Sequence, residues 1–255
     1  MKKISKIKAR KALFWVLLGM LAAVFIFSAF MIFRHFYDAR RSAGQFEQLT
    51  DLTEQTQPET PQATEPSPKE KYASVLAQNE DFVGWIKIPD TRIDYPVVQT
   101  PHSPNYYLRR GFDKKYSYYG VPYAAEHCDV YTSDNVVIYG HNMNNGSMFS
   151  DLEKYRSQSF YEGHRYITFD TLEEFGTYEI IAVFQTAAGA KNEFKYFIFD
   201  DGNAEEFNAY VKECKARSLY SIDASAQDGD RLITLSTCEY TRENGRLVVV
   251  AKKIA

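Results

Sequence analysis

The chain has 255 residues, of which 45% are hydrophobic and 25% charged, and its formal net charge is −3 at pH 7. Residues 1–41 hold 9 of the 30 basic residues and only 1 of the 33 acidic ones, which leaves 21 basic and 32 acidic residues in 42–255. This acidic balance argues against nucleic acid as a partner, because nucleic-acid binding needs a basic surface. Three cysteines in a chain of this length do not make a disulfide scaffold.

Residues 1–41 predict a basic cytoplasmic tail followed by a transmembrane signal anchor. From Ala12 to Phe33, 22 consecutive residues carry no charge, and about 20 apolar residues suffice for a helix to cross a bilayer. Within residues 1–41, most of the basic residues precede this apolar segment. This excess places the N-terminus in the cytoplasm and the rest of the chain outside the cell. A cleaved signal peptide is the competing interpretation, but its apolar region is usually only about 7–15 residues long and ends at a small-residue cleavage site.

Residues 42–70 predict a disordered, extended linker. They are rich in Gln, Thr, Glu and Pro, with prolines at positions 58, 61, 66 and 68 and few large aliphatic residues. Such a stretch cannot bury enough apolar surface to offset the entropy lost on ordering. Residues 71–255 have the composition of a globular extracellular domain and are numerous enough for one hydrophobic core.

The globular part is predicted to be mainly β-structure with a few peripheral helices. Short apolar runs bounded by turn residues predict strands, and longer runs without a period of two predict helices. Strands are expected at 85–88, 95–98, 136–139, 166–169, 178–185, 195–199, 232–237 and 247–252. Helices are expected at 74–81, 148–158 and 204–218, the last after two aspartates that suit a helix N-terminus. About eight short strands favour a closed, or nearly closed, eight-stranded β-barrel.

The six residues Leu235-Ser236-Thr237-Cys238-Glu239-Tyr240 predict a reactive site. They follow one apolar β-type run, and Arg246 opens the next, so a thiol at a strand end precedes a guanidinium at a strand start. A thiolate is a nucleophile, and a guanidinium can stabilise a developing oxyanion. At least one cysteine must be unpaired, and we predict that it is Cys238. Whether Cys128 and Cys214 form a disulfide stays open, although Cys214 is better interpreted as a small buried hydrophobe.

His141 is the candidate proton carrier, because a cysteine nucleophile needs an acid–base partner. It follows the predicted strand 136–139 and Gly140, so it should emerge at the strand end into a loop of polar residues. The other histidines adjoin the membrane segment or lie in turns, loops or a helix end, and are weaker candidates: His35, His102, His127 and His164.

These residues together resemble the sortase family, and within it class B. The match rests on Leu235 to Cys238 with Arg246 opening a Val-rich last strand, and on Tyr139-Gly140-His141-Asn142 about a hundred residues earlier. Residues 84–89, 95–99 and 106–108, the helix expected before the cysteine strand and the N-terminal anchor also fit. The resemblance covers about 75–255 and implies a closed, eight-stranded sortase-type barrel.

The resemblance implies a cysteine transpeptidase on the outer face of the plasma membrane of a Gram-positive-type cell. Such enzymes cleave a secreted protein after the threonine of a C-terminal sorting signal and join it to an amine of a peptidoglycan precursor. Cys238 would form the thioacyl enzyme, His141 would transfer the protons, and Arg246 would hold the oxyanion. This chemistry needs no cofactor, and no metal-ligand spacing stands out in the sequence.

The resemblance further implies substrate-binding roles for Asn105, Leu108, Ser236, Thr237 and Glu239. Two departures from the class B pattern fall on this recognition side. Pro104 stands where the family often has an asparagine, with Asn105 one residue closer to Leu108, and Val121 to Glu126 has little of the expected apolar strand. The exact sorting motif therefore stays open.

Several alternatives also stay open. Arg242 competes with Arg246, but it lies in the turn around Asn244 and Gly245, whereas the family arginine adjoins the last strand. The acceptor could be a pilin lysine, which would make the protein a pilus polymerase, or water, which would make it a hydrolytic peptidase. A membrane-tethered binding domain without turnover is a further possibility, against which the presence of all three candidate catalytic residues argues.

Overall fold

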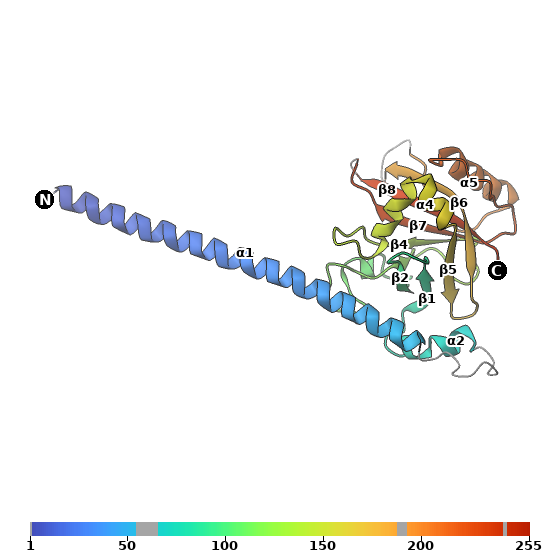
Figure 1. The fold of residues 1–255 in the computed structure, drawn as a ribbon, viewed down its shortest axis with the longest axis horizontal. Coiled ribbons are helices and arrows are strands. Elements are labelled where there is room, and N and C mark those ends of the chain that lie inside the picture. Colours follow the sequence, from blue (N-terminus) through green and yellow to red (C-terminus); the bar gives the residue numbers. More distant parts are fainter. Residues whose placement is uncertain (1, 55–65, 188–192, 242–243) are drawn as a thin grey trace. The chain divides into compact units, whose positions relative to one another are not determined.

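A computed structural model describes residues 2–54, 66–187, 193–241 and 244–255 (Figure 1). The chain divides into two compact units, Met1–Ala43 and Gly44–Ala255. In the described ranges the second unit contains eight strands: β1 (Phe82–Lys87), β2 (Asp94–Val98), β3 (Tyr123–Ala124), β4 (Asn135–Tyr139), β5 (Tyr166–Thr171), β6 (Thr177–Ala187), β7 (Leu232–Cys238) and β8 (Gly245–Lys253). They form a closed barrel in the order β1-β2-β3-β4-β7-β8-β6-β5. This confirms the predicted eight-stranded barrel.

The helices are few and mostly short, as the sequence predicts. They are α1 (Lys2–Glu54), α2 (Pro68–Lys71), α3 (Ala73–Leu76), α4 (Gln158–Gly163), α5 (Ala204–Arg217) and two 3₁₀ helices, η1 (Tyr106–Arg109) and η2 (Phe149–Arg156). The helix expected at 148–158 is thus a 3₁₀ segment that ends before α4 begins, and the helix expected at 74–81 ends at Leu76. Asn79 N donates to the Leu76 carbonyl 3.2 Å away as the chain turns toward β1.

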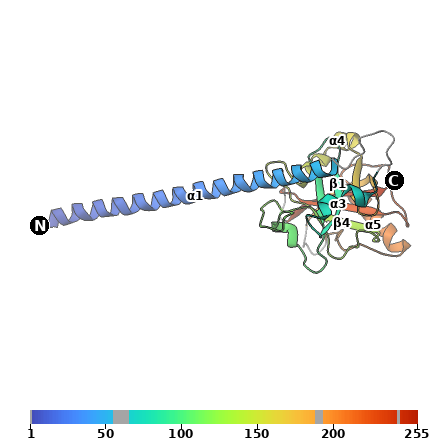
Figure 2. The ribbon, with the colours of Figure 1, turned by 90° about the horizontal axis from the view of Figure 1, so that it is seen from below.

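Helix α5 explains why β6, β7 and β8 are apolar on both faces. Asn203 caps its N-terminus by accepting hydrogen bonds from the backbone N–H groups of Glu205 and Glu206, and Glu206 completes a capping box. The buried side chains of α5 recur at helical spacing and belong to one core cluster with the three strands: Phe207, Tyr210, Val211 and Cys214. The helix therefore covers the outside of the barrel wall (Figures 1 and 2).

The prediction of a strand at 195–199 is wrong, and β3 is instead one of the eight strands of the barrel. Residues 195–199 form turns, and their aromatic side chains serve as packing groups: Tyr196 is buried and its hydroxyl lies 2.6 Å from Ser236 Oγ. The Phe199 carbonyl accepts a hydrogen bond from the Asn135 side chain, 2.8 Å away. Strand β3 has only two residues, Tyr123 and Ala124, which is too short for an alternating pattern.

The observed helices differ from the linker predicted over 42–70. Helix α1 continues to Glu54, and its last turns bury Phe46 and Leu49 within the second unit, where the Phe46 ring lies 5.1 Å from that of Tyr95. These two apolar side chains, three residues apart, lie on one face of the helix. Helix α2 begins at Pro68 after a Ser67 cap, and residues 55–65 lie outside the described ranges.

The first unit consists of the N-terminal part of α1. Within the described residues, one helix is long and apolar enough to cross a membrane, and it contains a window of mean hydropathy 2.7. The large apolar side chains between Leu13 and Phe33 are exposed. An N-terminal membrane span is therefore supported by length and composition.

Candidate functional site

The strand pairing brings three distant residues to one edge of the barrel. Strand β4 pairs in parallel with β7, with Tyr139 opposite Ser236, so the residues that follow both strands lie at the same end. Strand β8 is antiparallel to β7, with Cys238 opposite Arg246. His141, Cys238 and Arg246 therefore meet, although His141 precedes Cys238 by almost a hundred residues.

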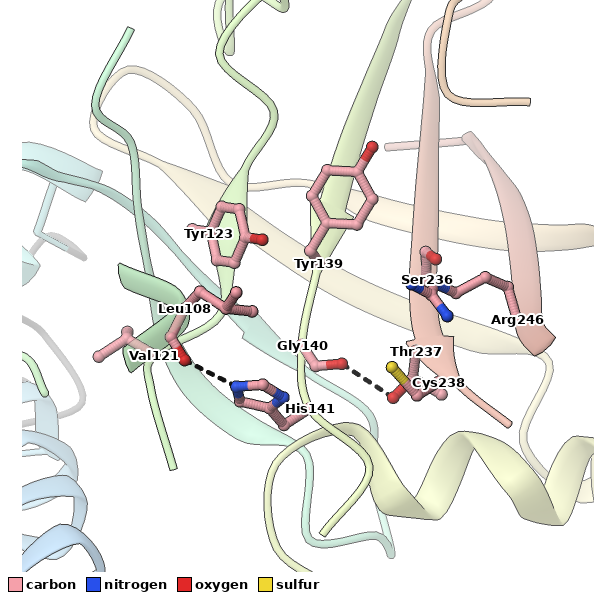
Figure 3. Close-up of a pocket in the computed structure, with 10 residues that line it drawn as sticks. All are labelled: Leu108, Val121, Tyr123, Tyr139, Gly140, His141, Ser236, Thr237, Cys238 and Arg246. Atoms are coloured by element: carbon pink, nitrogen blue, oxygen red, sulfur yellow. Dashed lines mark hydrogen bonds between the residues drawn. The ribbon is translucent and has the colours of Figure 1, made fainter. Parts of the chain in front are cut away.

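These three residues line one open pocket (Figure 3). Its walls come from the loop around η1, from β3, from the end of β4 and from the facing ends of β7 and β8. The lining residues are Leu108, Val121, Tyr123, Tyr139, Gly140, His141, Ser236, Thr237, Cys238 and Arg246. His141, expected to emerge into a cleft, and Cys238 thus line the same pocket.

Cys238 differs from the other two cysteines in its exposure. All three are free, but only Cys238 is partly exposed, at the end of β7. Burial raises the pKa of the Cys128 thiol to about 12 and also raises the pKa of Cys214. Both buried thiols therefore stay protonated and packed in the core cluster, which leaves Cys238 as the accessible thiol.

The geometry around His141 fixes its tautomer. Its Nε2 lies 2.7 Å from the Leu108 carbonyl oxygen, which can only accept, so Nε2 carries a hydrogen. In the neutral ring Nδ1 is then unprotonated, and Figure 3 shows this second nitrogen on the side of Cys238. Burial lowers the pKa of His141; the hydrogen bond to Leu108 opposes this shift and the charge of Arg109 adds to it. The neutral ring therefore predominates at neutral pH and can accept a proton at Nδ1.

Arg246 opens β8 and is half-buried. Its Nη1 donates to the Gly245 carbonyl over 2.9 Å, and Figure 3 shows the side chain extending from β8 over β7, on the side where the Cys238 sulfur lies. A guanidinium keeps its positive charge at all physiological pH values and presents several donors, which suits it to an oxyanion. The competing Arg242 lies outside the described residues.

Of the two residues expected to bind substrate before β3, only Leu108 lines the pocket. Asn105 does not line it; its backbone is left-handed, with φ of 57°, and its Oδ1 accepts a hydrogen bond from the Tyr123 hydroxyl 2.7 Å away. Asparagine adopts this conformation more readily than most residues. Asn105 therefore orients a pocket-lining tyrosine, which the sequence did not single out.

The three residues expected to bind substrate around Cys238 have side chains engaged within the protein. The Ser236 hydroxyl is bonded to Tyr196, and the Thr237 hydroxyl donates to the Gly140 carbonyl over 2.8 Å (Figure 3). The Glu239 carboxylate is fully buried and accepts from Arg156 Nη2 at 2.7 Å. Ser236 and Thr237 line the pocket, whereas Glu239 does not.

Two further features of the pocket could not be predicted from the sequence pattern. The rings of Tyr123 and Tyr139 lie 5.5 Å apart and form one wall. Gly140 is required between Tyr139 and His141, because a Cβ there would come within 2.5 Å of the Phe149 ring. In the described residues no group of three or more His, Cys, Asp or Glu side chains is placed to hold a metal.

Comparison with known proteins identifies relatives of this chain and solved structures with a similar fold. The sortase domain family model matches residues 86–254. Sortase B of Staphylococcus aureus is 30% identical over 240 residues, which cover 92% of this chain and 94% of that protein. Sortase B of Listeria monocytogenes is 33% identical over 179 residues, covering 69% and 71%. A solved structure of the Staphylococcus aureus sortase B–substrate complex has a TM-score of 0.75 at 28% identity, covering 86% of this chain and 98% of that one.

Proposed function

Because the chain belongs to the sortase family and, within it, to class B, we propose that it is a membrane-anchored cysteine transpeptidase. It cleaves a C-terminal sorting signal of a secreted protein after threonine and transfers the protein to an amine of a peptidoglycan precursor. The observation that carries this proposal is the pocket shared by His141, Cys238 and Arg246. The similarity to a sortase B solved in complex with its substrate supports the substrate class.

In the first half of the reaction the enzyme is acylated. The Cys238 sulfur attacks the threonine carbonyl as the thiol proton passes to Nδ1 of His141, and the resulting oxyanion accepts hydrogen bonds from Arg246. The tetrahedral intermediate collapses when His141 protonates the departing amine. A thioester joins the secreted protein to Cys238, and the remainder of the signal leaves. The neutral state and the tautomer of His141 support this proton path.

In the second half an acceptor amine attacks the thioester. His141 takes a proton from the attacking amine, Arg246 again stabilises the oxyanion, and the Cys238 thiol is restored as the new amide forms. No redox or metal step enters this balance. The predicted cofactor-free chemistry stays part of the proposal.

The apolar part of α1 anchors the enzyme in the plasma membrane, with the N-terminus in the cytoplasm and the catalytic domain outside. The excess of basic residues before the apolar segment supports this orientation. Secreted proteins that carry sorting signals, and the precursor amine on the outer face, are then the partners.

One experiment tests the activity and the acceptor together. The full-length chain in detergent is given a library of pentapeptide signals with diglycine or a lysine amine as acceptor. Amide formed with diglycine supports cell-wall anchoring, and amide formed only with lysine favours the pilin-polymerising alternative. Acid as the sole product favours a hydrolase, whereas the absence of any thioester on Cys238 would leave the silent binding domain.

A further inference from the structure

We propose that Arg156 is a positioning residue for this reaction: it acts through Glu239 to keep Cys238 opposite Arg246. Arg156 ends η2 and lies 83 residues before its partner Glu239. It does not line the pocket. The inference deepens the proposed transpeptidase function and rests on it, because it concerns the geometry of the same thiol.

Glu239 closes the turn that separates the nucleophile from the arginine. Its carboxylate is 0% exposed, and Oε2 accepts from Arg156 Nη2 at 2.7 Å and from the hydroxyl and the backbone N–H of Thr241, at 2.6 Å and 3.0 Å. Its own backbone N–H donates to the Gly245 carbonyl over 3.0 Å. A Cβ on Gly245 would collide with the Glu239 carboxylate. Thr241 and Gly245 therefore both pack against this one side chain.

A second connection reaches the backbone of Cys238. Asn142 follows His141, and its Nδ2 donates to the Cys238 carbonyl over 2.9 Å and to Glu153 Oε1 over 3.4 Å. Glu153 Oε2 in turn lies 2.7 Å from Arg156 Nε. We call Asn142, Glu153, Arg156 and Glu239 the nucleophile clamp. It joins the loop that carries His141 to the turn that follows Cys238.

The charges of the nucleophile clamp explain why Arg156 matters. Burial by itself raises the pKa of Glu239, but the hydrogen bonds from Thr241 and Arg156 outweigh it and hold this pKa below its usual range. Glu239 is therefore ionised at neutral pH and is buried with its compensating guanidinium. Without Arg156 this buried carboxylate would lose a cationic partner, and buried charges that lose such a partner move toward water or take up a proton. Either response displaces the turn between β7 and β8.

The test uses the full-length chain in detergent and three variants: Arg156→Gln, Arg156→Lys, and Arg156→Gln combined with Glu239→Gln. Arg217→Gln is the matched control, because Arg217 pairs with Glu213 on α5 over a similar distance, 2.6 Å, away from the pocket. We expect Arg156→Gln to lower kcat for thioester formation about 10- to 100-fold, the scale of a misplacement of about 1 Å. KM should change little, Arg156→Lys should restore part of kcat, and the control should match the wild type.

The double variant tests the role of the buried charge. It removes the charge together with its partner, so its melting temperature should rise above that of Arg156→Gln, and kcat should recover in part because no unpaired carboxylate displaces the backbone after Cys238. A double variant no more active than Arg156→Gln, or an Arg156→Gln variant as active as the wild type, would overturn the proposed positioning role.

Hydrogen–deuterium exchange gives a readout that does not need turnover. The Glu239 amide, which is bonded to the Gly245 carbonyl, should exchange faster in Arg156→Gln than in the wild type and in Arg217→Gln. Unchanged exchange would overturn the nucleophile clamp. A wild-type protein that forms no thioester would instead count against the transpeptidase activity, and exchange would still decide the role of Arg156.

Discussion

At the scale of single residues, the proposed site combines one thiol, one imidazole and one guanidinium at the same edge of the barrel. Cys238 should be indispensable because no other accessible thiol lines the described pocket. We expect Cys238→Ala to abolish cleavage of a sorting-signal peptide, with the circular dichroism spectrum and melting temperature of the wild type. Near-normal turnover by this variant, followed by mass spectrometry of the products, would exclude Cys238 as the nucleophile.

His141 and Arg246 should each be costly to remove. We expect His141→Ala and Arg246→Ala to lower kcat/KM at least about 10²- to 10³-fold, the range for a lost acid–base or oxyanion group. Arg110→Ala is a control, since Arg110 stacks on Tyr106 with 4.2 Å from its Cζ to the ring centroid and does not line the pocket. A loss below tenfold in either variant would mean that another group performs the assigned role.

The low pKa of His141 predicts the acid limb of the pH–rate profile. Acylation needs the neutral ring, so kcat/KM should fall with decreasing pH, with a midpoint below the usual histidine pKa of about 6.5. Arg109→Gln removes a positive charge that lowers this pKa, so the acid limb should shift to higher pH. Arg110→Gln should leave it in place. An unshifted limb in Arg109→Gln would assign the titration to another group.

The sequence was sufficient to bring three candidate residues to one pocket, because each stands at the start or just past the end of an apolar strand run. It was not sufficient for Arg156 and Glu239. Their contact depends on how η2 packs against the β7–β8 turn, and no local pattern encodes a pairing across 83 residues. For the same reason the sequence could not show that Glu239, which was expected to bind substrate, has a buried carboxylate paired with Arg156.

At the scale of secondary structure, α5 illustrates how a local signal and tertiary packing agree. Asn203 accepts two backbone hydrogen bonds at the N-terminus of α5, so Asn203→Ala should lower the free energy of unfolding by about 1 kcal/mol. Asn208→Ala makes the same substitution at an exposed position inside the helix, where it should be neutral or slightly stabilising. Urea denaturation measures both, and equal effects would show that the cap contributes nothing. The kcat of both should match the wild type, because α5 does not line the pocket.

The elements that the sequence misassigned depend on hydrogen bonds to distant parts of the chain, which no local pattern shows. Residues 195–199 resemble a strand because they are rich in aromatic residues. In the structure, however, the Phe199 carbonyl accepts a hydrogen bond from the Asn135 side chain. Strand β3 is invisible in the sequence because two residues carry no period, although Tyr123 pairs both with Val98 and with Tyr139. Pairing with neighbours, and not propensity, decides both cases.

At the scale of the whole molecule, all pocket residues belong to the unit Gly44–Ala255, whereas the apolar span belongs to Met1–Ala43. A variant that lacks residues 2–41 should therefore keep its turnover of soluble peptides and lose its association with membranes. Liposome flotation measures the second property, and peptide cleavage measures the first. Flotation of the truncated variant at the level of the full-length chain would place the anchor elsewhere.

The position of β8 has a consequence for the proposed exported transpeptidase. This strand supplies Arg246 and pairs with both β7 and β6, so it completes the barrel, and it follows every other strand in the order of synthesis. A chain still threading through the secretion machinery would hold a cysteine without its oxyanion partner and without a finished pocket wall. Under the proposed function, the reactivity of Cys238 therefore begins only once β8 has joined the barrel.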